Sequence, residues 1–219
     1  MRYLYIAVIS GVFIWLGLLP SEWVGPAPDR IIRVVEGAGV PNAVTGILLH
    51  FRLYDTIFEV FVFTAAVLGV QQYLTRDREA PEVHHISDDS IVILARIGAM
   101  IAGLVALELA IRGHLGPGGG FAAGVAGGTC IVLVAVTSEQ VRLKKGHERW
   151  RAAVWEKSSV LIFMALTVPV LSGMEYPKGG FGALLSGGAI PWLNFLIAFK
   201  VAIGSWTILH LFIRYRGLL

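Results

Sequence analysis

The stretch Gly113-His-Leu-Gly-Pro-Gly-Gly-Gly-Phe121 decides how this chain folds, because an apolar run flanks it on each side. Residues 94–111 precede it and residues 122–136 follow it. Glycine allows backbones to approach closely and supplies positive φ angles, while Pro117 fixes one dihedral and removes a hydrogen-bond donor. The pattern predicts a tight, irregular turn at the edge of a membrane, packed against neighbouring protein so that each amide finds a partner.

The composition is that of an integral membrane protein. Hydrophobic residues make up 56% of the 219 residues, charged residues only 15%, and the mean hydropathy is +0.72. Soluble domains are roughly one quarter charged, and a spanning helix needs about 20 mostly apolar residues. We therefore expect an all-α bundle of six transmembrane helices, at residues 3–19, 56–73, 91–111, 121–137, 154–171 and 191–213. Close contacts between these helices are expected at Gly98, Gly103, Gly124, Gly127 and Gly128.

The basic residues predict the orientation of the bundle. Cytoplasmic loops of membrane proteins carry an excess of lysine and arginine. The loop after the fourth expected helix is the most basic, with Arg142, Lys144, Lys145, Arg149, Arg151 and Lys157. Placing it in the cytoplasm puts both termini on the cytoplasmic side as well.

The linear sequence argues against several classes of function. The pI near 9.2 does not indicate a nucleic-acid partner, because the basic charge is confined to particular loops. The triple glycine is not a phosphate-binding loop, since no strand precedes it and no Lys-Ser/Thr pair follows. Dinucleotide fingerprints, cysteine clusters and nucleophile elbows are missing from the sequence too. We expect no catalytic residue, no cofactor and no metal centre.

The chain divides at residues 75–90, TRDREAPEVHHISDDS, whose mixed charges are typical of a cytoplasmic linker. Residues 1–74 hold two expected spans separated by a long external segment. Residues 91–219 hold four expected spans with short connections. The sequence thus predicts a two-helix part and a four-helix part.

The external segment of the first part contains two amphipathic runs. Residues 29–37 are expected to form a short helix that lies flat at the external interface. Residues 42–51 form the second run and are expected to lead straight into the second span. Asn42 is the expected N-cap of this run.

Lys200 is the ionisable group whose position is most costly in a membrane, because it lies near the middle of the last expected span. A charged group at the bilayer centre costs about 2.5–3.5 kcal/mol on insertion scales. One interpretation is a proton or cation relay, in which burial makes the ammonium proton exchangeable. The other is a structural ion pair with an acidic residue of a partner protein. Both interpretations stay open.

Two carboxylates lie near the external end of the second expected span. Asp55 and Glu59 are four residues apart, so they share one helix face. Two carboxylates on one face are suited to attracting a cation, and Arg52 is the only obvious counter-charge nearby. We regard both as candidates for an ion path.

Two further candidates lie just before and within the glycine turn. Glu108 precedes Arg112 by four residues, which fits either an ion-path carboxylate or a simple helix ion pair. His114 has an ordinary pKa near 6.5, so it could pass protons at the membrane surface. A bond from His114 to a nearby backbone carbonyl is the structural alternative.

The motif GHLGPGGGF at residues 113–121 resembles the hallmark of the B-type subunit of Mrp-type (multiple resistance and pH) sodium/proton antiporters. The same subunit type occurs in membrane-bound hydrogenases and related archaeal respiratory complexes. The four spans of that family match residues 91–213, its last helix carries a lysine in the context of Lys200, and a second glycine-rich loop fits residues 179–182. The motif positions would be Gly113, Pro117, Gly118, Gly119, Gly120 and Phe121.

The first part of the chain resembles a different piece of the same machinery. NAVTGILLHFRLYDTIFE, residues 42–59, is similar to a run near the end of the large A-type subunit of Mrp antiporters. In the membrane-bound hydrogenase, that segment is a separate small protein of the E type. The chain therefore looks like an E-type segment, residues 1–74, fused to a B-type subunit, residues 91–219.

The resemblance implies a membrane component that does not transport alone. It would assemble with Mrp-type subunits of the A, C, D, E, F and G types, among the lipids of a prokaryotic cell membrane, and would help to form a path for Na⁺ exchanged against H⁺. The same module inside a redox-driven ion pump, of the membrane-bound hydrogenase or sulfur reductase type, is the alternative, and a purely structural scaffold is a third. The ion-path positions would be Asp55, Glu59, Glu108, His114 and Lys200.

Overall fold

The computed structural model describes residues 28–76, 88–137 and 152–216. These residues form helices and connecting segments without a strand, which confirms the all-α class. The first expected span, most of the linker and the basic loop lie outside them. The helical elements are α2 (Pro28–Ala38), α3 (Ala43–Gly46), the π-helix η1 (Ile47–Phe51), α4 (Leu53–Leu74), α5 (Asp89–Arg112), α6 (Gly120–Val136), α8 (Ala152–Leu171) and α9 (Ile190–Arg216).

Five expected spans fall within the described residues, and each is a helix. Among these helices, α4, α5, α8 and α9 are long and apolar enough to cross a membrane. The helix α6 is equally apolar but has only 17 residues. The helix α6 begins at Gly120, within the glycine turn, and the turn occupies the positions that a longer helix would fill. The orientation of the bundle stays a prediction.

The second amphipathic run does not lead straight into the next span, contrary to the prediction. Asn42 caps α3 as expected, because its Oδ1 accepts hydrogen bonds from the amides of Val44 and Thr45. The backbone then widens into η1 and leaves the helical region at Arg52, with φ −123° and ψ 36°. The Thr56 hydroxyl donates to the Leu48 carbonyl at 2.9 Å and so satisfies an acceptor near this break.

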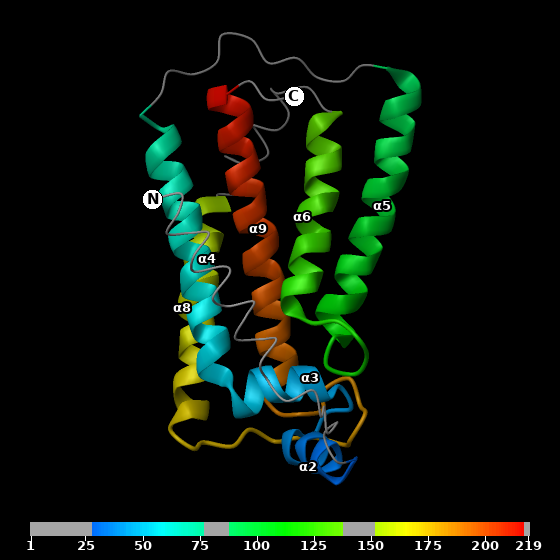
Figure 1. Cartoon of the computed structure of the whole chain (residues 1–219), viewed down its shortest axis with the longest axis vertical. Helices are drawn as coiled ribbons and strands as arrows, with labels where there is room; N and C mark the ends of the chain where they lie inside the picture. The colour runs from blue at the N-terminus through cyan, green and yellow to red at the C-terminus, as the bar shows by residue number, and fades with distance from the viewer. Residues whose placement is uncertain (1–27, 77–87, 138–151, 217–219) are drawn as a thin grey trace, which may run out of the picture. The chain divides into compact units, whose positions relative to one another are not determined.

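From Val34 onward, the described residues form one compact unit in which α9 is central (Figure 1). The helix α9 packs against α6, and also against α8 and α4, while α5 packs mainly on α6. The main hydrophobic core lies where α4, α8 and α9 meet, and includes Leu53, Ile57, Val60, Phe163, Leu193, Ile197 and Val201. Helices from both parts of the chain therefore share one core.

Glycines on α6 bring this helix close to α9. Gly120, Gly124 and Gly128 follow one another at four-residue intervals, so they lie on one face. A Cβ atom at Gly120 would lie 2.6 Å from the backbone oxygen of Asn194, and a Cβ atom at Gly124 would overlap Val201. The predicted contacts at Gly124 and Gly128 are confirmed. Added Cβ atoms would also lie within 3.2 to 3.3 Å of neighbouring side chains at Gly98, Gly103 and Gly127.

The helix α5 is the least buried of the spans. Only 6% of its most apolar 18-residue window is buried, against 44% for α9. Its outward side chains include Leu94, Met100 and Leu104, each about two-thirds exposed. In lipid, such a face contacts either acyl chains or another protein.

Candidate functional site

A buried ion pair lies in the middle of the bundle. The Lys200 ammonium on α9 donates a hydrogen bond of 2.7 Å to Oε1 of Glu156, near the start of α8. Lys200 is 2% exposed and Glu156 is 5% exposed. The ion pair of the second interpretation is therefore present, but its acid comes from this chain and not from a partner protein. A buried charge needs such a counter-charge, since desolvation without one is strongly unfavourable.

The pair lies where the two parts of the chain meet. The Lys200 ammonium is 5.8 Å from the ring centroid of Phe63 on α4, within the range of a cation–π contact. Gly204 on α9 makes room for the same ring, because a Cβ atom there would overlap it. On the other side, the Ser159 hydroxyl donates to the Glu156 backbone carbonyl at 2.7 Å. A change in charge at the pair would therefore act on α4, α8 and α9 together.

Sequence reasoning missed Glu156, although a signal was present. A lysine at mid-depth requires a carboxylate, and Glu156 is the only acidic residue within residues 154–171. Its neighbour Lys157 suggested the end of a cytoplasmic loop instead. In the structure, Glu156 and Ser159 lie on the inward face of α8 and are buried, while Lys157 is exposed. Glu156 therefore belongs to the helix and not to the loop.

The glycine turn is held from one side by the first part of the chain. Asn42 Nδ2 donates to the carbonyl oxygens of Gly113 at 2.7 Å and Gly116 at 2.6 Å. The Thr45 hydroxyl donates to the Gly113 carbonyl at 3.0 Å. Asn42 thus uses Oδ1 to cap α3 and Nδ2 to hold the turn. The predicted packing of irregular backbone against neighbouring protein is found within this chain.

Asn194, in the first turns of α9, holds the turn from the other side. Its Nδ2 donates to the carbonyls of Leu109 at 3.0 Å and Ala110 at 2.8 Å, which belong to the last turn of α5. The Ala110 carbonyl lies in the last turn, where carbonyls lack the usual helical partner, so the Asn194 amide supplies one. The Leu109 carbonyl also accepts from the Gly113 amide at 2.9 Å. The Oδ1 atom of Asn194 is buried and has no hydrogen-bond partner in the described part of the chain.

Within the turn, the motif residues have distinct roles. Gly118 and Gly119 have φ angles of +149° and +147°, which side chains rarely adopt. Pro117 is exposed, and Phe121 packs on the main core. The glycines therefore set the path of the backbone, while Phe121 anchors it.

His114 is fully buried inside the turn. Neither ring nitrogen has a hydrogen-bond partner of good geometry among the described residues. Burial lowers the pKa of the imidazole from its ordinary value, and the backbone of Ala183 and Leu184 opposes this shift in part. The ring is therefore stabilised in its neutral form.

The remaining predicted acids lie apart from the buried pair. Asp55 forms an ion pair with Arg52, and Glu108 pairs with Arg112 at 3.1 Å, with both pairs at the surface of the chain. The simple helix-pair interpretation of Glu108 is thus the one the geometry matches. Glu59 differs, because it lines a pocket together with the glycine turn.

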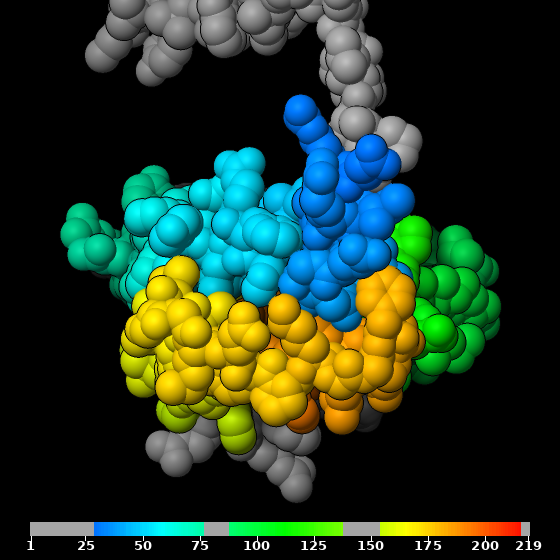
Figure 2. Space-filling view, turned by 90° about the horizontal axis from the view of Figure 1, so that it is seen from below, coloured from blue at the N-terminus to red at the C-terminus, as the bar shows by residue number. Residues whose placement is uncertain are grey.

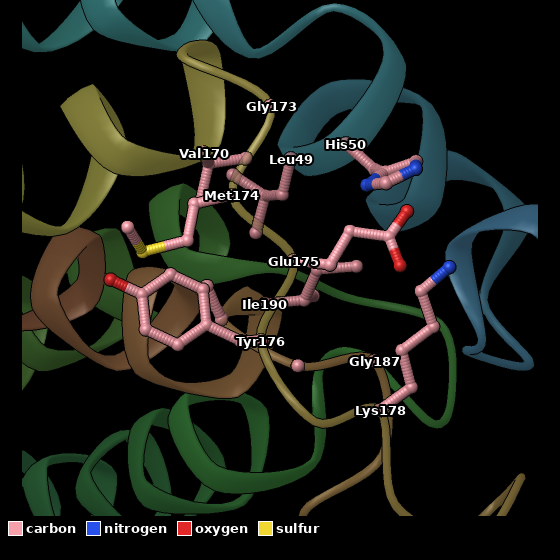
Figure 3. A pocket seen from close by; sticks show the side chains of 12 residues that line it. Leu49, His50, Val170, Gly173, Met174, Glu175, Tyr176, Lys178, Gly187 and Ile190 are labelled. Atoms are coloured by element: carbon pink, nitrogen blue, oxygen red, sulfur yellow. The ribbon is translucent and has the colours of Figure 1, made fainter.

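A second pocket, of about 150 Å³, lies beside the loop between α8 and α9. Seen from below, this loop, residues 172–189, lies next to the start of α4 (Figure 2). Inside the pocket, the Glu175 carboxylate is directed between His50 and Lys178 (Figure 3). The Lys178 ammonium donates to the Gly37 carbonyl at 3.0 Å. This set of ionisable side chains was not predicted, because His50 lies far from Glu175 and Lys178 in the sequence.

The fold and the site define a class, namely a multi-pass membrane protein built as a helical bundle with a buried ion pair. A family model described as a domain related to the MnhB subunit of Na⁺/H⁺ antiporter matches residues 90–207, more than half of the chain. The chain belongs to this family and is a membrane subunit of the Mrp antiporter type.

A curated relative and two solved structures extend this likeness. The relative is the A/B subunit of a probable K⁺/H⁺ antiporter of Rhizobium meliloti (strain 1021), and it is 36% identical over an alignment that covers 46% of this chain. The alignment covers 13% of that relative, so the chain spans only a small part of its length.

A chain of the membrane-bound sulfane sulfur reductase, an archaeal respiratory membrane complex, has a TM-score of 0.73 at 25% identity. That match covers 97% of this chain and 98% of the other. A chain of the Mrp complex from Dietzia sp. DQ12-45-1b has a TM-score of 0.65 at 17% identity, and the match covers 95% of this chain and 25% of that one. The fold of the described residues, including α4 of the first part of the chain, therefore recurs in chains of other membrane complexes.

Proposed function

We propose that this chain is a non-catalytic subunit that helps to form the ion path of a multi-subunit cation/proton antiporter. The observation that carries the proposal is the Lys200–Glu156 pair, buried where α4, α8 and α9 meet. Membership of an antiporter family supports the same function. The family description names Na⁺ and the curated relative names K⁺, so the proposal is for a monovalent cation.

The pair can respond to ions by moving one proton. If the proton passes from Lys200 Nζ to Glu156 Oε1, an ammonium and a carboxylate become a neutral amine and a neutral acid. The pair then carries no charge, and the attraction that holds α8 against α9 weakens. A cation or proton arriving from a neighbouring protein of the complex would shift this balance, because the low-dielectric interior strengthens charge interactions. Asp55, Glu59 and His114 would serve nearer the external surface, while Glu108 would stay paired with Arg112.

The partners are proposed to be the other Mrp-type subunits, of the A, C, D, E, F and G types, in a prokaryotic cell membrane. The exposed apolar face of α5 supports such assembly, because the other described helices of this chain bury only a small part of it. Residues 1–74 are proposed to act as the E-type segment and residues 91–219 as the B-type subunit.

A second candidate function is the same role inside a redox-driven ion pump. The match to the sulfane sulfur reductase supports it, because that match runs over nearly the full length of both chains. In this case electron transfer in other subunits would drive ion movement, and this chain would hold no redox group.

The test begins with the native complex. The tagged chain would be purified from its own membranes in mild detergent, and the co-purifying subunits identified by mass spectrometry. Antiporter subunits without redox subunits support the exchanger, and added iron–sulfur or hydrogenase-like subunits support the pump. The purified complex would then be reconstituted into vesicles, where a Na⁺ or K⁺ gradient should drive proton movement. A chain that purifies alone, or a complex that exchanges no cation, would contradict the proposal.

A further inference from the structure

Five exposed side chains of α8 recur at intervals of three or four residues, at Val154, Lys157, Leu161, Ala165 and Val168. We call this set the outer face of α8. Four of its members are apolar, and Lys157 is its one charged residue. We propose that this face binds a transmembrane helix of a partner subunit, and that an aspartate or glutamate of that helix pairs with the Lys157 ammonium. The inference goes beyond an ion path and rests on the proposed function only because it needs a multi-subunit complex.

The buried ion pair shows how deep Lys157 lies. Glu156 binds Lys200, which lies about 15 Å along α9 from Ile190 and about 24 Å from Arg216. Because Lys157 follows Glu156, the two residues differ in depth by only about 1.5 Å. The helix α8 also begins well short of the level at which α9 ends (Figure 1). Lys157 therefore lies in the middle of the bundle rather than at either end.

An ammonium at this depth needs a counter-charge. Lys157 forms no ion pair with any residue in the described part of the chain. The neighbouring helix α4 offers none, because residues 60–74 include no charged side chain. A charged group surrounded by hydrocarbon is strongly unfavourable, and ionisable residues within membranes nearly always have partners.

The Glu156 carboxylate does not serve Lys157 as well as Lys200. Successive residues of an α-helix lie about 100° apart around its axis, so Glu156 faces α9 while Lys157 faces away from it. Their burial agrees with this arrangement, because Glu156 is buried and Lys157 is exposed. The acid that pairs with Lys157 therefore comes from outside the described residues.

Lipid headgroups do not supply this negative charge. The hydrocarbon core of a bilayer is about 30 Å thick, so the phosphates lie about 15 Å or more from its centre. A lysine side chain is much shorter than this distance, and snorkelling serves lysines near the ends of a span. A carboxylate carried by another protein can lie at the required depth.

The apolar members of the outer face show that this protein contributes a transmembrane helix. Leu161 is 71% exposed, and Val154 and Val168 are each about half exposed, so apolar surface lies on both sides of Lys157 along the helix. Ala165 is small and lets a second helix approach closely. A helix that is apolar except for one carboxylate matches this surface in both polarity and charge, whereas a soluble domain does not.

Cross-linking identifies what covers the outer face. The photo-reactive residue p-benzoylphenylalanine would replace Leu161 in the tagged chain, and the cells would be irradiated before the complex is purified. We expect a cross-link to a transmembrane peptide of another subunit, identified by mass spectrometry, with an aspartate or glutamate within one helical turn of the cross-linked position. A cross-link to lipid only, or to residues 1–27 or 138–151 of this chain, would overturn the proposal.

Charge variants test the ion pair itself. Lys157→Met should lower the yield of intact complex at least tenfold, because it leaves the partner's carboxylate buried and unpaired. Lys157→Arg keeps the positive charge and should assemble like the native chain. Leu161→Met is the matched control, because it lies one turn along the same face and changes no charge. A native yield from Lys157→Met would contradict the pair.

A charge exchange separates the failure of this inference from the failure of the proposed function. Lys157→Glu should prevent assembly, and replacing the partner's cross-linked acid by lysine in the same cells should restore it. If the native complex is intact and Lys157→Glu assembles normally, the inference is wrong and the proposed function stands. If the native chain purifies alone, the proposed function itself is wrong.

Discussion

At the glycine turn, two neutral asparagine amides hold backbone carbonyls in place, whereas in the middle of the bundle the Lys200 ammonium and the Glu156 carboxylate bind each other. The turn distributes its polar contacts over several carbonyls, each involved in a modest hydrogen bond. The buried pair concentrates two full charges in one contact. Loss of one partner should therefore be graded at the turn and severe at the pair.

The largest effect is expected from Lys200→Ala. It leaves the Glu156 carboxylate buried without a counter-charge, which destabilises by about 3–5 kcal/mol when a buried pair is broken. We expect poor assembly of the complex and loss of cation exchange, measured by the yield of intact complex and by transport in vesicles.

The double variant Lys200→Met with Glu156→Met sharpens this prediction. Removing both charges should restore much of the stability, because apolar side chains of similar volume replace an ion pair well. Exchange should stay lost if the pair belongs to the ion path. If the double variant assembles stably and exchanges cations at the native rate, the pair has a structural role only.

Asn42→Ala should have the next largest effect. It removes the cap of α3 and both bonds to the turn, and the loss of a cap alone costs about 1 kcal/mol. Asn42→Asp is the informative partner variant, because a carboxylate can still cap the helix but cannot donate to Gly113 or Gly116. Thermal unfolding of the complex should rank native above Asp and Asp above Ala; equal stability of Asp and native would contradict a role for Nδ2.

The buried His114 predicts a smaller, pH-dependent effect. Burial lowers its pKa in the folded state below the value near 6.5 that it has when unfolded. Below pH 6.5 the unfolded state binds a proton that the folded state does not, so stability falls as the pH is lowered. The Tm measured from pH 8 to pH 5 should decline less in His114→Gln than in the native complex. Parallel declines would show that another group titrates.

The smallest effect is expected from Glu108→Gln. Its ion pair with Arg112 lies at the surface of the chain, with both side chains about 60% exposed. Exposed pairs one helical turn apart contribute about 0.3–0.5 kcal/mol. Stability and exchange should stay near native values. A large loss of exchange with normal assembly would restore Glu108 to the ion path.

Local features of the sequence predicted much of the fold. The five long helices α4, α5, α6, α8 and α9 follow from their apolar runs, and the cap at Asn42 follows from its residue type and the proline before it. The break at Arg52 was missed, because a π-helix leaves no distinct pattern in a short run that is mostly apolar. Features that depend on residues close together in the sequence could therefore be predicted.

The candidate site depended on contacts between distant residues. Glu156 and Lys200 stand on different helices, and their pairing depends on how α8 and α9 rotate against each other. Asn194 was not among the predicted site residues, since nothing nearby in the sequence shows that its amide reaches α5. Glu59, by contrast, stood out because a carboxylate in an apolar run is conspicuous.

The double use of Asn42 bears on how this chain relates to shorter ones. The Oδ1 atom of its amide caps a helix of the first part and the Nδ2 atom binds carbonyls of the second, so the two parts contact each other through residues outside the linker. Phe63 against Gly204 repeats this recognition deeper in the bundle. The covalent link between the two parts is then not required for assembly. Two polypeptides, divided between residues 76 and 88 and made separately in one cell, would associate and form the same bundle.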